Sequence, residues 1–195
     1  MERYEDKIEK ALQYLKSPSR TDARGVSPIV YLVYKPEDAI IIRNVIDTYL
    51  CPKAEFYGFK VKFVSIGELI DKYINSHDYR EIWTDPSVSE EGMYNSIKQE
   101  MSSDEFFEHA ILNIQEQFKN EQNVLLVLRD IEMLHPFYMM GVIENKIYNQ
   151  IKTPMLVMYP GETQGTARSF LGVYNQDGNY RSINFYYCPL NFMSL

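Results

Sequence analysis

The sequence has little cysteine, and its two cysteines belong to no recognisable site. Cys51 and Cys188 form no CxxC pair and have no histidine at metal-ligand spacing. A structural zinc site needs four Cys or His ligands at short spacings, so the sequence predicts no zinc centre. Two cysteines in 195 residues are also typical of a protein from a reducing compartment.

Long hydrophobic runs are absent as well. No apolar stretch approaches the roughly 20 residues that a membrane-spanning helix needs. The first ten residues, MERYEDKIEK, are charged and amphipathic, unlike the apolar core of a signal peptide. We therefore expect a cytoplasmic protein that does not use a membrane.

Basic residues are in deficit. The chain has 20 Lys and Arg against 27 Asp and Glu, a net charge of −7. Non-specific nucleic-acid binding needs a broad basic face, which this balance disfavours. Direct DNA binding would require Lys35, Arg129, Arg168 and Arg181 to gather into a local cluster.

Apolar and aromatic residues, by contrast, are plentiful. With 45% hydrophobic residues the chain can bury a sizeable core, and we expect one domain over residues 1–195. The 16 tyrosines suit either half-buried surfaces such as protein interfaces, or core positions. Several lie in or beside predicted strands, which favours the core for part of them: Tyr31, Tyr34, Tyr159, Tyr180, Tyr186 and Tyr187.

Hydrophobic periodicity predicts alternating strands and helices. Short, continuous apolar runs predict strands over 28–34, 60–66, 123–128 and 154–159, with the very apolar run 123–128 at the centre. Helical spacing predicts helices over 3–16, 36–50, 68–74, 104–118 and 137–151, the fourth opened by a capping box at Ser102–Glu105. Residues 75–101 are expected to form a loop or short helices, and Gly-rich loops with antiparallel strands near 169–174 and 181–187 to close the chain. This order predicts a three-layer α/β fold with a mostly parallel sheet, flanking helices and antiparallel C-terminal strands.

The motifs of common enzymes are missing. GxSxG, HExxH, GxGxxG and the Walker A motif GxxxxGK[ST] do not occur. The strand order suits a sheet like that of P-loop NTPases, but the turn after the first strand, Lys35-Pro36-Glu37-Asp38, has no glycine, and Pro36 removes a backbone donor. We expect a degenerate P-loop-like scaffold, not an enzyme, with no catalytic residue, metal or cofactor.

Candidate binding residues follow the strands, because ligands of open α/β sheets bind beyond the carboxyl ends. After the first strand, Glu37 and Asp38 are best explained as helix caps. After the strand 123–128, the residues Arg129, Asp130 and Glu132 are best explained as surface ion pairs, although acids at a strand end can also hold Mg²⁺.

The stretch after the strand 154–159 is the most distinctive. YPGETQGTAR, residues 159–168, carries two glycines, two threonines and an arginine. It could form a backbone nest for an anion with Arg168 as a charged clamp, or a structural turn that positions the C-terminal strand. The candidate binding surface then comprises Lys35, Arg129, Asp130, Tyr159, Gly161, Gly165, Arg168, Tyr180 and Arg181.

Taken in order, several segments resemble the BrxB family of the BREX bacteriophage-exclusion systems. They are LKSPS at the end of the first helix, YKPED, His135-Pro136-Phe137, YPGETQG, the RSFL segment from Arg168, and the NYR that ends at Arg181. The resemblance implies defence against phage DNA replication in an assembly with a PglZ-type phosphatase-like protein, a methyltransferase and ATPases. It brings no established catalytic activity.

Two functions are therefore expected from different classes. The first is a non-catalytic interaction subunit of a BREX complex that docks on a PglZ-type partner. The alternative is a nucleotide- or phosphate-sensing protein that uses residues 159–168.

Overall fold

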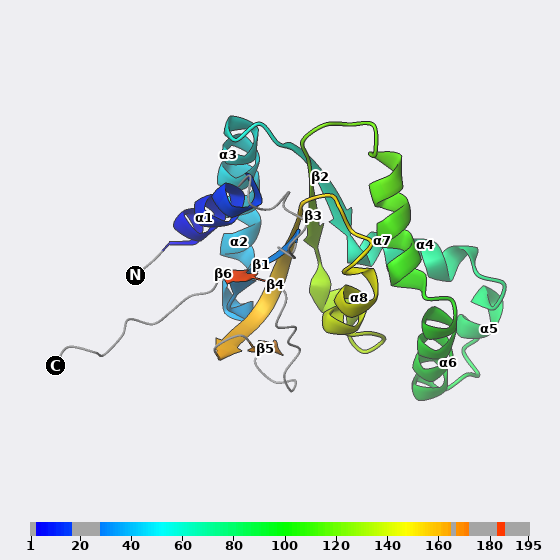
Figure 1. The fold of residues 1–195 in the computed structure, drawn as a ribbon. Coiled ribbons are helices and arrows are strands. Elements are labelled where there is room, and N and C mark those ends of the chain that lie inside the picture. The colour runs from blue at the N-terminus through cyan, green and yellow to red at the C-terminus, as the bar shows by residue number, and fades with distance from the viewer. Residues whose placement is uncertain (1–2, 17–27, 165–166, 172–182, 186–195) are drawn as a thin grey trace.

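The fold, in a computed structural model that describes residues 3–16, 28–164, 167–171 and 183–185, is built on one mostly parallel sheet (Figure 1). Five strands lie parallel in the order β2-β3-β4-β1-β6, and β5 pairs antiparallel with β4. The strands are β1 (Ile29–Tyr34), β2 (Lys60–Ser65), β3 (Val124–Arg129), β4 (Met155–Gln164), β5 (Ala167–Phe170) and β6 (Ile183–Phe185). The expected α/β class with a mostly parallel sheet is confirmed.

Helices cover both faces of the sheet. They are α1 (Tyr4–Lys16), α2 (Ala39–Val45), α3 (Cys51–Phe56), α4 (Ile66–Ser76), α5 (Arg80–Trp83), α6 (Glu90–Ser103), α7 (Phe106–Gln117) and α8 (Met140–Ile147), with short helical turns η2 (Pro36–Asp38), η3 (Ile46–Leu50) and η4 (Ile131–Leu134). Figure 1 shows α1, α2 and α3 on one face and α4 to α8 on the other. No helix in the described ranges is both long and apolar enough to cross a bilayer.

Two hydrophobic cores result, one on each face. Along β1, Tyr31 and Val33 point into the core under α4 to α8, whereas Val30 and Leu32 point into the core under α1 to α3. Every residue of β1 is buried for this reason, which explains why its sequence is continuously apolar instead of alternating. The three-layer prediction is therefore confirmed.

The middle of the sheet differs from the prediction. The central strand is β4, with β3 and β1 beside it, although β3 was expected there for its apolar sequence. Both β3 and β4 lie inside the sheet with neighbours on each side, so their apolar content does not distinguish them. Of the two expected antiparallel C-terminal strands, β5 is confirmed and β6 runs parallel to β1.

Three helix boundaries also differ. The helix after β1 does not stop at Cys51-Pro52: Pro52 lies in the first turn of α3, where its missing N–H is not needed. The expected capping box at Ser102–Glu105 is wrong, because Ser102 lies in the last turn of α6, and α7 starts at Phe106 after a left-handed Glu105 (φ 46°). The helix expected from residue 137 begins only at Met140, since residue 135 before Pro136 is extended.

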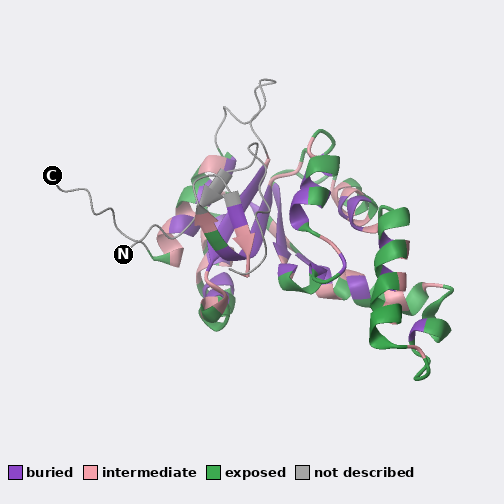
Figure 2. Cartoon of the chain, turned by 90° about the horizontal axis from the view of Figure 1, so that it is seen from below, coloured by how far each residue is buried: buried purple, intermediate pink, exposed green. Residues whose placement is uncertain are grey.

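Residues 77–105, here called the arm, contain α5 and α6 and extend from the sheet beyond α4. An aromatic cluster holds the base of the arm. The ring of Trp83 stacks on that of His77 with 4.5 Å between the ring centroids, and the ring centroids of Tyr73 and Phe106 lie 4.4 Å apart. Trp83 is 3% exposed, and its indole N–H donates to Ser96 Oγ at 2.9 Å. Figure 2 shows that the outer surface of these helices is otherwise mostly exposed.

Candidate functional site

At the carboxyl ends of β2 and β3, charged side chains neutralise one another. Asp130 has a left-handed backbone (φ 60°) and accepts a hydrogen bond from Ser65 Oγ at 2.6 Å. Arg129 lies 3.5 Å from Glu68 and 3.7 Å from Asp130, with its guanidinium 5.4 Å from the centre of the Phe63 ring. The ion pairing predicted for Arg129 and Asp130 is present. Within the described ranges, no three His, Cys, Asp or Glu side chains lie close enough to hold a metal.

The charged side chains that follow β1 are also paired within the chain. Lys35 Nζ lies 3.6 Å from Glu37 Oε1. Asp38 occupies the N-cap position of α2 but makes no side-chain capping bond, so this part of the capping prediction is wrong. Its carboxylate instead accepts a hydrogen bond from Tyr4 Oη at 2.5 Å, which attaches α1 to the start of α2.

Residues 159–164 form a strand where a turn was expected. β4 continues through Gln164 and folds back on β5, with Gly161 opposite Phe170 and the N–H of Leu171 donating to the Pro160 carbonyl at 3.0 Å. A Cβ on Gly161 would lie 2.2 Å from the Ser169 carbonyl oxygen, so glycine is needed here for close strand approach. The interpretation of YPGETQ as a Gly-rich turn after the strand is therefore wrong.

Arg168, the expected anion clamp, is fully buried. Its Nη2 lies 3.2 Å from Glu144 Oε2, and both side chains are 0% exposed. Tyr31 Oη donates to the same carboxylate oxygen at 2.7 Å, and the Arg168 guanidinium stacks 3.5 Å from the centre of the Tyr31 ring. The ring of Tyr159, also buried, lies 5.7 Å from that of Tyr31. Arg168 therefore joins β5 to α8 inside the molecule and does not face a solvent anion.

The predicted binding surface is only partly assembled. Tyr159, Gly161 and Arg168 come together in the β4–β5 hairpin, but as packing residues. Because Arg168 is buried, it cannot join Lys35 and Arg129 in a basic surface cluster. Three further predicted residues, Gly165, Tyr180 and Arg181, lie outside the described residues.

A hollow of about 450 Å³, which was not predicted from the sequence, opens beside these strand ends. It lies between α6 on one side and the segment from η4 to α8 on the other, and we call it the groove. Its lining is Lys98, Ser102, Ile131, Leu134, His135, Pro136, Phe137, Tyr138, Met139, Met140, Val142 and Phe170. Most of these side chains are apolar, and Met139 and Val142 are 55% and 42% exposed.

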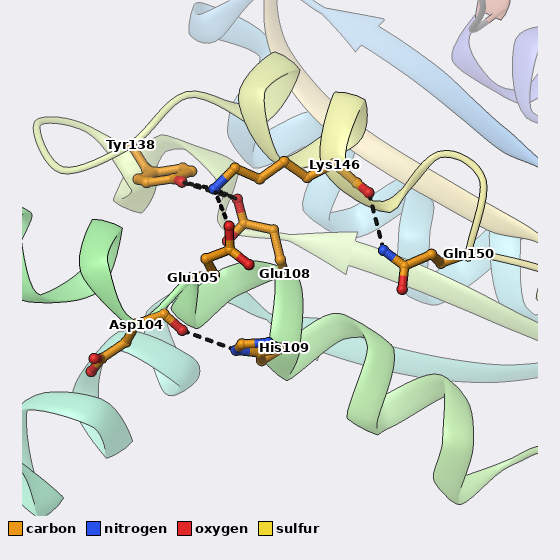
Figure 3. Close-up of polar contacts among 7 residues, drawn as sticks. All are labelled: Asp104, Glu105, Glu108, His109, Tyr138, Lys146 and Gln150. Atoms are coloured by element: carbon orange, nitrogen blue, oxygen red, sulfur yellow. Dashed lines mark hydrogen bonds and ion pairs between the residues drawn. The ribbon is translucent and has the colours of Figure 1, made fainter.

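A cluster of polar side chains supports one wall of the groove (Figure 3). Tyr138 Oη donates to Glu108 Oε1 at 2.9 Å, and Lys146 Nζ lies 3.1 Å from Glu105 and 3.4 Å from Glu108. The hydrogen bond to Glu105 raises the pKa of Lys146, and burial raises the pKa of Tyr138. The cluster joins α7, α8 and the segment before α8, and it holds Tyr138 in place beside the groove.

Sequence reasoning missed two features here. Glu144 lies in α8 with the sequence MGVIENKI, where it shares a helix face with the apolar Met140 and Ile147, a position that could have indicated a buried charge in need of a partner. The groove has a weaker signal, the run from Leu134 to Met140, which contains apolar residues in a segment that follows a strand end.

The comparisons with known proteins identify the family. A model of the family BrxB, with the description "BREX protein BrxB", matches residues 62–185. The matched range runs from within β2 to the end of β6 and includes the arm, the groove and the buried Arg168. The segments LKSPS and YKPED lie before the match. Searches of curated proteins and of solved structures found no match. Since the family model spans well over half of the chain, this protein belongs to the BrxB family of BREX proteins.

Proposed function

We propose that this chain is a non-catalytic interaction subunit of a BREX assembly that docks on other BREX proteins, in particular on one of PglZ type. Membership of the BrxB family makes it a component of a BREX phage-defence system. The observation that supports a docking role is a difference between charged and apolar side chains at the carboxyl edge of the sheet. Charged side chains there bind one another, whereas apolar side chains of the groove remain exposed.

The alternative of phosphate or nucleotide sensing has less support. It depends on Arg168 as a clamp and on backbone donors of a turn at 159–168. Arg168 is buried against Glu144, and the backbone of 161–164 pairs with β5. If a nucleotide does bind, a thermal-shift screen with nucleotides and Mg²⁺ will show it, because a ligand at 100 times its Kd stabilises a protein by about 2.7 kcal/mol. We expect no shift.

Affinity purification tests the docking role. The chain carries a tag and is expressed with the rest of its BREX system, and the proteins that it retains are identified by mass spectrometry. We expect a PglZ-type protein among them and loss of phage resistance when the gene is deleted. Retention of no BREX protein, together with full resistance in the deletion strain, contradicts the proposal.

The control for this experiment is a variant in which the fold is intact and an apolar surface is changed elsewhere. Ile40 is 84% exposed on α2, which lies on the sheet face opposite the groove. Ile40→Asp should retain the same BREX proteins as the natural chain.

A further inference from the structure

The apolar surface of the groove continues beyond the hollow itself. Tyr94 of α6 is 41% exposed, and its ring lies 5.9 Å from that of Phe137 in the groove. On the opposite wall, Met139 and Val142 are also half exposed. Tyr94 is not part of the lining, so it extends the apolar surface on the α6 side, and we call the exposed side chains of Tyr94, Met139 and Val142 the strip. A small ligand that filled only the hollow would leave Tyr94 in water. A helix, about 10 Å across with its side chains, can lie along the strip and cover both walls.

Charge is concentrated next to this strip. The arm holds eight carboxylates and two basic side chains, so it carries −6 of the net charge of −7. Glu91 lies one turn before Tyr94 on the same side of α6, and Lys98 lies one turn after it. Among the described residues that line the groove, Lys98 alone has a full charge. A segment bound along α6 therefore meets a surface whose overall charge is negative.

We propose that the groove binds an amphipathic helix of a partner protein that carries Lys and Arg on its polar face. The inference rests on the proposed docking function and names the surface and the chemistry of the partner. The apolar face of the helix packs on Tyr94, Met139 and Val142, and its basic residues face the arm. Methionine suits such a site, because its flexible side chain adapts to different apolar surfaces.

Two synthetic peptides test the partner chemistry directly. One is an amphipathic helix of Leu and Lys, and the other has the same pattern with Glu in place of Lys. Fluorescence anisotropy with the full chain should show binding of the Leu/Lys peptide that weakens as salt rises, and little binding of the Leu/Glu peptide. Equal affinity for both peptides, or absence of binding to the Leu/Lys peptide, overturns the inference.

Substitutions locate the binding surface. Met139→Asp places a charge at a half-exposed position and should weaken Leu/Lys binding by about tenfold or more, whereas Ile40→Asp should leave it unchanged. Circular dichroism verifies that both variants are folded, and Val142→Asp provides a second groove variant. If neither groove variant weakens binding, the groove is not the site.

Reversal of the charge of Lys98 tests whether the acidic surface along α6 attracts the basic peptide. Lys98→Glu replaces a cation of the lining with an anion and should tighten Leu/Lys binding by about two- to fivefold, the range of an exposed ion pair. Weaker binding of the Leu/Lys peptide would mean that its lysines are not attracted to the acidic surface along α6, and would overturn the proposal.

The same variants separate this inference from the proposed function. If the natural chain and Met139→Asp retain the same BREX proteins in affinity purification, the docking function stands and the groove is not its surface. If the natural chain retains none of them and deletion of the gene leaves phage resistance intact, the docking function fails, whatever the peptides show. We expect the natural chain and Ile40→Asp to retain a partner that Met139→Asp loses.

Discussion

Arg168 and Glu144 form an ion pair that solvent does not reach. Burial of two charges is costly, and here the cost is offset by the contact between them, the hydroxyl of Tyr31 and the stacking of the guanidinium on its ring. The sequence predicts Arg168 as an anion clamp or as part of a structural turn, whereas the structure places it in a buried ion pair. Its partner lies 24 residues earlier in a different element, and that pairing depends on the tertiary fold.

Removal of one charge of this pair should be severe. Arg168→Ala leaves the Glu144 carboxylate buried without its cation, and we expect the free energy of unfolding to fall by about 3–5 kcal/mol. Urea denaturation followed by circular dichroism measures the change.

A variant without any of the charges is the control. The triple variant Tyr31→Phe, Glu144→Leu, Arg168→Met removes both buried charges together with the Tyr31 hydroxyl that donates to Glu144, so stability should recover most of the loss. A loss below about 1 kcal/mol for Arg168→Ala would contradict the buried environment of the pair.

Gly161 should not tolerate a side chain. Gly161→Ala places a Cβ 2.2 Å from a backbone oxygen of β5, and the strands must move apart, at a cost of about 1–3 kcal/mol. Gly67 is the matched control, because its nearest contacts would lie at 3.6 Å and it is helical, so Gly67→Ala should be neutral or stabilising. Equal stability changes for both variants, measured by urea denaturation, would show that β4 and β5 do not approach so closely.

At the scale of elements, burial decides what the sequence predicts well. The strands β1 and β3 are predicted almost to the residue, because both of their faces are buried. The end of β4 is missed, since Pro160 and Gly161 are typical turn residues and only pairing with β5 keeps them extended. α6 is missed because just two of its side chains, Ile97 and Met101, are buried, which is too sparse for a helical stripe.

Trp83 should control the stability of the arm independently of the sheet. Its indole fills the space between α5, α6 and the ring of His77. Trp83→Ala should therefore open α5 and α6, and hydrogen exchange should become faster in residues 80–103 while β3 keeps its protection.

Ile82 provides the comparison within the same helix. It is 56% exposed, so Ile82→Ala should leave exchange in the arm unchanged. If Trp83→Ala raised exchange in β3 as much as in the arm, the arm would unfold only together with the sheet.

At the scale of the whole molecule, the abundance of tyrosine and the excess of acids prove to be linked. Among the residues that the structure describes, six tyrosine hydroxyls donate to carboxylates, those of Tyr4, Tyr31, Tyr49, Tyr57, Tyr73 and Tyr138. In a chain with fewer basic than acidic residues, phenols provide hydrogen-bond donors that lysine and arginine cannot supply in sufficient number. The expected core role is confirmed for Tyr31, Tyr34 and Tyr159, whereas Tyr180, Tyr186 and Tyr187 lie outside the described residues.

The folded chain should therefore resist tyrosine ionisation. Burial above all raises the pKa of Tyr34, Tyr73 and Tyr138. In the unfolded chain these phenols lose their protons near pH ~10, so the stability they contribute is complete below that pH and is lost as the pH rises toward the folded pKa values. Part of the tyrosinate absorbance should appear only together with alkaline unfolding, measured by circular dichroism.

The chain unfolded in guanidinium chloride is the reference for this titration and should ionise smoothly near pH ~10. If the native chain gave its full tyrosinate absorbance at that pH with unchanged circular dichroism, the hydroxyls would be accessible and the prediction wrong.

The placement of charge on the arm has a consequence for how fast complexes form. With −6 at one end and about −1 in all other residues, the molecule has a large electric dipole moment along the direction in which the arm extends. A partner with a positive surface would turn the molecule arm-first before the two make contact, which raises the fraction of productive collisions. Dilute or crowded components of an assembly would then find one another in the correct orientation, and the bimolecular rate constant would depend on ionic strength more steeply than the dissociation rate does.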